Sequence, residues 1–141
     1  MQETLEPSAF ARLHALLRGL GRKALKNPEQ QIQRAVVAHL RARALHGVVF
    51  FHPANGGSRH PVEAAKLSGL GVLPGASDLI LLYGGRFHAL ELKAERGKVS
   101  PAQAEFITAV REAGGMAEVA TGIDETISIL EGWQLLKGKM Q

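Results

Sequence analysis

The 141-residue sequence contains no cysteine. This absence excludes disulfide scaffolds, catalytic thiols, iron–sulfur clusters and zinc sites built on cysteine. Only seven aromatic residues are present, which argues against a platform that stacks single-stranded bases. No run approaches the ~20 apolar residues that a membrane-spanning helix needs, and the N-terminus lacks the basic start and apolar run of a secretory signal. We therefore expect a cytoplasmic protein with no membrane partner.

Charge is distributed unevenly along the chain. Residues 1–46 hold 8 Lys/Arg and 3 Glu, a net charge of +5, whereas residues 47–141 hold 9 Lys/Arg and 10 acids, a net charge of −1. A basic segment suggests a polyanionic partner such as nucleic acid, although a solvated helical face explains the charge equally well. Of the 13 acids only Asp78 and Asp124 are aspartates, so each aspartate needs its own explanation.

Hydrophobic periodicity and turn residues predict an α/β protein with a central mixed sheet flanked by helices. The expected elements are a helix at 8–20, a helix from 27 that Gly47 ends, a buried strand at 47–52, a short amphipathic helix at 62–70, strands at 78–83 and 86–93, a helix from 100 that Gly114-Gly115 ends, a strand at 116–121 and a helix at 123–136. Asn27 with Gln30, and Ser100 with Gln103, are expected to form helix caps.

The pair Gly84-Gly85 between two apolar runs predicts a β-hairpin, because tight hairpin turns need positive φ angles. A two-residue turn there makes the numbers of facing residues sum to 169, so Asp78 faces Glu91. Facing residues lie on one side of the sheet, with Cβ atoms roughly 4.5–5.5 Å apart. Strand alternation places Lys93 on the same side as Glu91. Two acids and a lysine therefore converge at one end of the hairpin.

Two facing carboxylates repel each other, a cost that folding alone would not favour. A divalent cation converts this repulsion into coordination, and hard oxygen ligands suit Mg²⁺ or Mn²⁺. The alternative is structural: Asp78 caps a turn and Lys93 neutralises Glu91. The six histidines lack the close spacing of a metal site, and we expect ordinary core or surface roles for them.

Asp78, followed after twelve residues by Glu91-Leu92-Lys93, resembles the D-x(n)-E-x-K core of the PD-(D/E)XK nucleases. More narrowly, the chain resembles the virus-type replication-repair nuclease (VRR-NUC) domain. The supporting motifs, in the family's order, are Glu29 with Ile32-Gln33, Asn55-Gly56-Gly57 with Arg59, Gly71 and Gly75 before Asp78, and Gly97, Ser100, Gln103 and Gly114-Gly115 after Lys93. Ser77 is a departure, because the family usually has proline there. The resemblance covers residues 27–121.

The resemblance implies a role for each matching residue. Asp78 and Glu91, with the Leu92 carbonyl, would hold Mg²⁺ or Mn²⁺, and Lys93 would orient the attacking water. Glu29 would add an acidic contact to the metal site, although a first-turn glutamate also favours the helix dipole. Gln103 would lie near the site, although its capping role explains it as well. The implied DNA-binding residues are Asn55, Ser58, Arg59, Lys66 and Gln33.

The resemblance also implies a single restriction-endonuclease-like domain at 27–141, preceded by a helical extension at 1–26. The expected activity is metal-dependent endonucleolytic cleavage of branched DNA such as four-way junctions, in a bacterial or phage-infected cell and in DNA repair. The alternatives are a nuclease for flaps or single strands, a catalytically silent DNA-binding module, and a protein-interaction domain. We also expect a homodimer, with Phe10, Leu13 and Leu17 of the first helix in the contact.

Overall fold

The structure, a computed structural model, describes residues 27–54 and 60–138. The described residues fall into two compact units: unit 1 contains residues 27–48, Leu92–Gly97 and residues 120–138, and unit 2 contains residues 49–54, residues 60–91 and Lys98–Val119. The helix expected at 8–20, with Phe10, Leu13 and Leu17, lies outside the described residues. The division into an extension at 1–26 and a domain at 27–141 stays a prediction.

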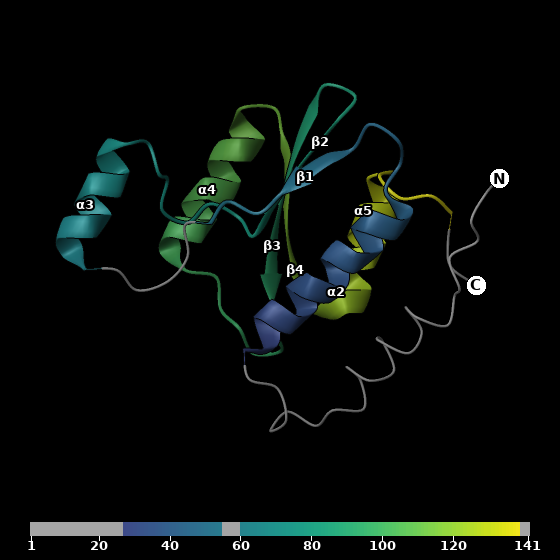
Figure 1. Cartoon of the computed structure of the whole chain (residues 1–141), viewed down its shortest axis with the longest axis horizontal. Helices are drawn as coiled ribbons and strands as arrows, with labels where there is room; N and C mark the ends of the chain where they lie inside the picture. Colours follow the sequence, from purple (N-terminus) through teal and green to yellow (C-terminus); the bar gives the residue numbers. More distant parts are fainter. Residues whose placement is uncertain (1–26, 55–59, 139–141) are drawn as a thin grey trace. The chain divides into compact units, whose positions relative to one another are not determined.

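The described elements follow the expected order of helices and strands (Figure 1). They are α2 (Pro28–Arg43), β1 (Val49–Phe51), α3 (Pro61–Gly69), β2 (Leu79–Tyr83), β3 (Arg86–Lys93), α4 (Pro101–Glu112), β4 (Met116–Thr121) and α5 (Gly122–Gly132). None of the helices in these two stretches is long and apolar enough to cross a membrane.

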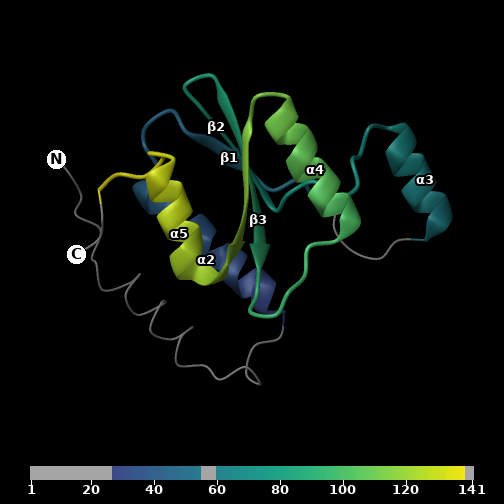
Figure 2. The same ribbon diagram turned by 180° about the vertical axis from the view of Figure 1, so that it is seen from behind.

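The strands form one sheet in the order β1-β2-β3-β4. β1 pairs with β2, and β2 with β3, in antiparallel fashion. Helix α4 connects β3 to its neighbour β4 (Figure 2), and a helical crossover of this kind is typical of parallel neighbours. The expected α/β class with a mixed sheet is confirmed.

The β2–β3 hairpin has the predicted register. Tyr83 pairs with Arg86, and Leu79 pairs with Leu90, so each pair of residue numbers sums to 169. Gly84 and Gly85 have φ angles of 58° and 76°, a region that residues with a Cβ atom enter at a cost. The turn glycines therefore fix which residues face each other along both strands.

In unit 2 one helix covers one face of the sheet. Ile80 of β2, Ala89 of β3 and Ala117 of β4 pack against Ile107 and Val110 of α4, as the apolar spacing of α4 predicts. Full burial of such a branched side chain contributes about 1.5–3 kcal/mol relative to exposure. This packing holds α4 beside β3, the strand that carries Glu91.

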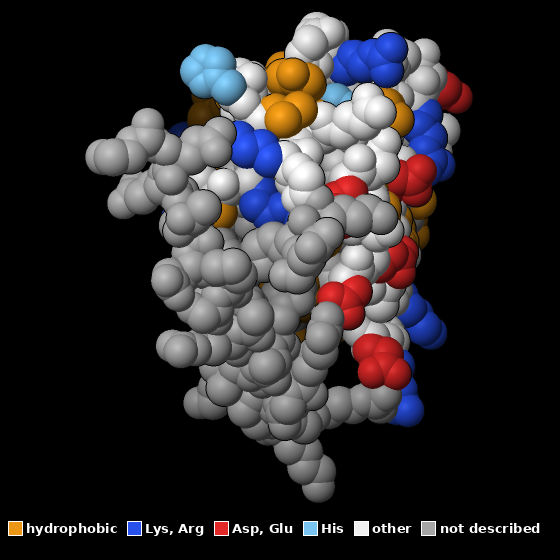
Figure 3. Space-filling view, turned by 90° about the vertical axis from the view of Figure 1, so that its right-hand side faces the viewer, with side chains coloured by type: hydrophobic (Ala, Val, Ile, Leu, Met, Phe, Trp, Pro, Cys, Tyr) orange, Lys and Arg blue, Asp and Glu red, His pale blue; other side chains and the backbone are white. Residues whose placement is uncertain are grey.

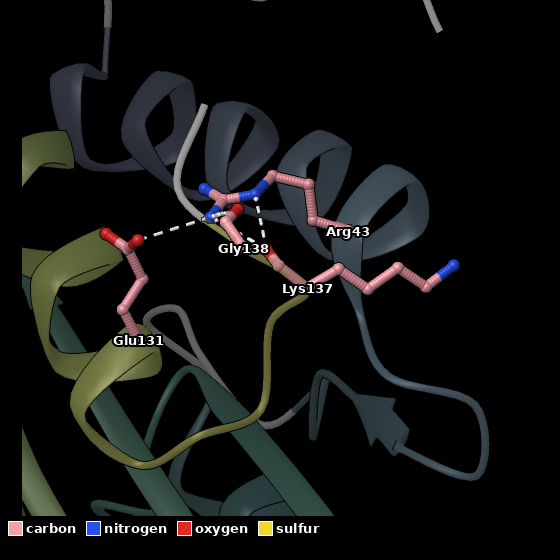
Figure 4. Close-up of polar contacts among 4 residues, drawn as sticks. All are labelled: Arg43, Glu131, Lys137 and Gly138. Atoms are coloured by element: carbon pink, nitrogen blue, oxygen red, sulfur yellow. Dashed lines mark hydrogen bonds and ion pairs between the residues drawn. The ribbon is translucent and has the colours of Figure 1, made fainter. Parts of the chain in front are cut away.

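In unit 1 helices α2 and α5 lie side by side (Figure 2). Arg43, in the last turn of α2, is only 7% exposed. Its guanidinium donates to the Glu131 carboxylate and to the carbonyl oxygens of Lys137 and Gly138 (Figure 4). The Lys137 N–H in turn donates to the Arg43 carbonyl at 2.6 Å. We call these four residues the Arg43 clamp, because they tie the segment after α5 to the end of α2.

Two expectations for α2 are wrong. Asn27 adopts the left-handed conformation and its side chain makes no capping hydrogen bond, so Asn27 and Gln30 form no capping box. The helix ends at Arg43 rather than at Gly47, because the chain turns at Ala44 into a single antiparallel bridge with Leu136. Pro28 does occupy the start of the helix, where its missing N–H costs nothing.

Other expectations failed on burial. The strand expected to be buried at 47–52 is only β1, and Val49 and Phe51 in it are 59% and 49% exposed. β1 is an edge strand, so only one neighbouring strand covers it. Helix α3 buries no residue, so the apolar face expected for this amphipathic helix is not packed against the sheet. The last helix stops at Gly132 rather than at 136.

Candidate functional site

The acid end of the hairpin lies just beyond the recorded strand pairs. Asp78 directly precedes β2, and the last pair of strands β2 and β3 is Leu79 with Leu90. One further step along both strands would set Asp78 opposite Glu91, which stays a prediction. Glu91 is 2% exposed and Asp78 is half-buried. A carboxyl group this deep needs polar partners, because burial of an unsatisfied charge is costly.

Gln103 of α4 supplies one such partner. Its side-chain Nε2 donates a hydrogen bond to Glu91 Oε1 at 2.7 Å. Its Oε1 accepts from the Ser100 backbone N–H at 2.9 Å, while the Ser100 hydroxyl accepts from the Gln103 N–H at 3.2 Å. The predicted capping box is confirmed, and the same amide that completes it also holds the buried acid.

A glycine brings the loop before Asp78 onto the same helix. Gly75 has a φ of +79°, and a Cβ there would lie 2.3 Å from the Ala102 carbonyl carbon. Real Cβ atoms do not approach backbone so closely, so only glycine fits between this loop and the first turn of α4. Ser77, which follows in the loop, is 1% exposed. The loop before Asp78 and the Glu91 carboxylate thus both lie against the start of α4, within unit 2.

His52, just beyond β1, adds a contact that sequence reasoning missed. Its Nδ1 lies 2.6 Å from the backbone oxygen of Asp78. The one sequence feature that could have indicated this contact is the placement of a histidine and a proline directly after an apolar strand. His52 was assigned an ordinary role because neither its spacing nor its type indicates a partner on another strand.

Unit 1 holds the other predicted catalytic residues. Lys93, two residues after Glu91 on β3, is 6% exposed. A Cβ placed on Gly97 would lie 3.0 Å from Glu29 Oε1 and 3.2 Å from Lys93 Cδ, so the Glu29 and Lys93 side chains both reach Gly97. The first turn of α2 and the turn after β3 line an open pocket there, whose residues are Asn27, Pro28, Glu29, Gln30, Ala94, Glu95, Arg96 and Gly97.

The remaining predicted residues are placed as follows. Leu92 is buried in β3, and Gln33 is half-buried one turn after Glu29 on α2. Lys66 is exposed on α3. The predicted DNA-binding residues Asn55, Ser58 and Arg59 lie outside the described residues. Their roles stay predictions.

The donor atoms suit a hard divalent cation. Within residues 27–54 and 60–138, no three His, Cys, Asp or Glu side chains group as a metal cluster. Magnesium usually keeps several waters and takes only one or two carboxylates from the protein. The Asp78 and Glu91 carboxylates of unit 2 are oxygen donors of that type.

Surface charge is mixed on the face that Figure 3 displays. Acidic and basic side chains of described residues are interspersed over it, without a continuous basic stripe among them. Binding of a phosphate backbone needs clustered cations.

The chain is similar to one protein-family model and to solved structures. The family model for the VRR-NUC domain matches residues 27–124. A solved structure described as a VRR_NUC domain protein has 28% sequence identity and a TM-score of 0.64, covering 82% of this chain and 97% of that chain. The structure of Hjc from Archaeoglobus fulgidus, described as a Holliday junction resolvase, has 20% identity and a TM-score of 0.42, covering 66% of this chain and 67% of that chain. A search of curated proteins gave no match.

Proposed function

Because the chain belongs to the VRR-NUC family, and so to the nucleases of the PD-(D/E)XK type, we propose that it is a Mg²⁺- or Mn²⁺-dependent DNA endonuclease. One observation carries the proposal most strongly. Glu91 is buried at the end of the hairpin, opposite Asp78 in register, and a glutamine amide holds it. A purely structural carboxylate gains nothing from a second acid directly across the sheet.

Asp78, Glu91 and the Leu92 carbonyl are the groups that would hold the cation. A bound divalent ion would polarise the scissile phosphodiester and lower the pKa of the attacking water. Gln103 fixes the rotamer of Glu91 through its hydrogen bond to Oε1. An ordered carboxylate is pre-organised for a metal, because supporting hydrogen bonds orient metal ligands.

Lys93 and Glu29 would complete the chemistry. Lys93 would orient the attacking water and stabilise the negative charge that develops on the phosphoryl oxygens. Its low exposure strengthens that interaction, since water screens a charge less when it is buried. Glu29 would add an acidic contact to the metal site. Gln33, Lys66, Asn55, Ser58 and Arg59 are proposed to contact DNA.

The substrate we propose is branched DNA such as a four-way junction, in DNA repair or in phage infection. This rests on the resemblance to small stand-alone members of the family. Resolving a junction requires two cuts related by symmetry, which two copies of one chain supply through a two-fold axis. We therefore propose a homodimer as the active species.

The cleavage test uses the full chain with linear, flapped and four-way DNA, in Mg²⁺, Mn²⁺ or chelator. We expect cleavage of four-way DNA only with metal, and a loss of at least about 10²-fold in kcat for Glu91→Gln, which removes the charge but keeps the shape. Lys93→Ala should be equally impaired. Glu118→Gln is the matched control, because Glu118 is exposed and forms an ion pair with the exposed Arg111.

The possible results separate the candidate functions. If flapped DNA is cleaved in preference to four-way DNA, the proposed substrate is wrong but the proposed nuclease activity stands. Tight DNA binding without any cleavage would indicate a silent binding module. Full cleavage in chelator would overturn the metal mechanism.

Multi-angle light scattering tests the dimer. The edge strand β1 exposes Val49 and Phe51, and an exposed apolar edge favours association. We expect twice the mass of one chain at the concentration used for cleavage, and a shift toward the monomer in Phe51→Lys. A monomer that still cuts a junction symmetrically contradicts the homodimer.

A further inference from the structure

The pairing of β1 with β2 would leave the Asp78 carbonyl opposite a residue that cannot donate to it. The last pair of these strands is Phe51 with Ile80, so two steps further Pro53 faces Asp78. Proline has no backbone N–H. The chain therefore offers no ladder hydrogen bond from that position to the peptide that follows Asp78.

The imidazole of His52 takes the place of this missing donor. Nδ1 lies 2.6 Å from the Asp78 oxygen, well within hydrogen-bonding distance. A carbonyl oxygen only accepts, so Nδ1 must carry the proton, and the neutral ring then has its lone pair on Nε2. The bond fixes both the ring tautomer and the orientation of the Asp78–Leu79 peptide.

Orientation of this peptide controls where the Asp78 carboxylate points. Asp78 directly precedes β2, one position beyond the last recorded pair of β2 and β3. On its other side, Gly75 packs the preceding loop against α4. The His52 bond thus anchors Asp78 from the β1 side, at the point where the strand begins.

We propose that His52 is a positioning residue that aligns the Asp78 carboxylate with Glu91 for metal binding, through the donor that Pro53 cannot supply. This inference rests on the proposed nuclease function, and it assigns His52 no contact with substrate. Supporting residues of this kind matter because a misplacement of ~1 Å can cost about 10²-fold in rate.

Three substitutions of His52 distinguish the effect of the hydrogen-bond donor from that of the aromatic ring. The amide nitrogen of asparagine occupies nearly the place of Nδ1, whereas that of glutamine reaches the place of Nε2, and phenylalanine keeps the ring without a donor. We expect His52→Asn to retain kcat within about threefold of wild type, and His52→Gln and His52→Phe to lose about tenfold or more. KM for DNA should stay unchanged, because the DNA contacts are untouched.

Metal binding can also be measured without catalysis, from the effect of Mn²⁺ on the melting temperature. The concentration of MnCl₂ that gives half of the maximal rise in melting temperature should increase about tenfold in His52→Gln and His52→Phe but not in His52→Asn. His46→Phe is the matched control, since His46 is an exposed histidine in the turn before β1. Wild-type kcat and Mn²⁺ response in His52→Phe would overturn the proposal.

The hydrogen bond can be tested without any variant. ¹⁵N spectra of the metal-free protein should show the proton of His52 on Nδ1, the nitrogen that donates to the Asp78 carbonyl. A proton on Nε2 overturns the proposal. If the wild-type protein neither cleaves DNA nor responds to Mn²⁺, the proposed nuclease function is wrong. If the wild type is active and His52→Phe has the same kcat and Mn²⁺ response, only the positioning role of His52 is wrong.

Discussion

Glu29 and Lys93 both approach Gly97, where glycine leaves room for their side chains. An added Cβ would lie 3.0 Å from Glu29 Oε1, 3.0 Å from the Ala94 oxygen and 3.2 Å from Lys93 Cδ. These distances are tighter than ordinary van der Waals contact, so at least one neighbour must move. Gly97 has no positive φ, and alanine there meets no backbone strain of its own.

We predict that Gly97→Ala lowers kcat about tenfold with little change in melting temperature, because it displaces two proposed catalytic side chains by a fraction of an ångström. Gly132→Ala is the control, since a Cβ there meets nothing within 4 Å. Steady-state cleavage of four-way DNA measures both. Shortening Glu29 to aspartate should restore part of the activity in Gly97→Ala while lowering it in wild type. Strictly additive losses would contradict this crowding.

Sequence placed the acid pair but not all of its support. The positions of Asp78 and Glu91 on the hairpin can be predicted because the two turn glycines set the strand register. The position of Gln103 can be predicted because it completes the capping box with Ser100. The link from His52 to Asp78 depends on the pairing of β1 with β2, which no local pattern encodes. The meeting of Glu29 and Lys93 at Gly97 likewise joins segments more than sixty residues apart in sequence.

Elements defined by local chemistry were predicted best. β3, β4 and the start of α4 match the expectations residue by residue, because turn glycines and a capping box specify them within a few residues. Asn27 failed as a cap because its backbone turns left-handed. The burial of β1 failed because an apolar run reveals nothing about which strand becomes the edge of the sheet.

The Arg43 clamp joins two elements whose connection the sequence did not reveal. Arg43 was counted only as part of the basic N-terminal third, yet it is 7% exposed and bonds three different residues. We predict that Arg43→Lys lowers the free energy of unfolding by about 2 kcal/mol, because a lysine cannot reproduce the planar fork of donors. Arg41→Lys, in the same helical turn but exposed, should cost less than about 0.5 kcal/mol.

Urea denaturation of both variants checks this prediction. A normal slope with a lower midpoint would show that stability alone has changed. If Arg43→Lys unfolds at the wild-type midpoint, the clamp contributes nothing to the stability of the protein.

Metal binding should be visible in the stability of the whole molecule. Asp78 and Glu91 repel each other when no cation is present, so Asp78→Asn should hold or raise the melting temperature in chelator. Wild type should gain about 2.7 kcal/mol of stability at a Mn²⁺ concentration 100 times its Kd, because metal binds only the folded state. Asp78→Asn should lose most of that gain together with cleavage.

Scanning calorimetry of both proteins, with chelator and with Mn²⁺, provides the measurement. Clear destabilisation of the metal-free protein by Asp78→Asn would identify Asp78 as a structural cap. An absence of any Mn²⁺ effect on wild type, at concentrations that support cleavage, would place the metal elsewhere.

The Arg43 clamp also sets an order of events during synthesis on the ribosome. The partners of Arg43 lie 88 to 95 residues further along the chain, and translation adds about 5–20 residues per second. Helix α2 therefore waits several seconds before α5 and its following segment exist to cover it. During that interval the apolar side chains that α2 buries in the folded protein, Ala35, Val36 and Leu40, are available to chaperones. A nascent chain stalled before residue 120 should bind them far longer than one stalled beyond residue 138 and fully extruded from the ribosome.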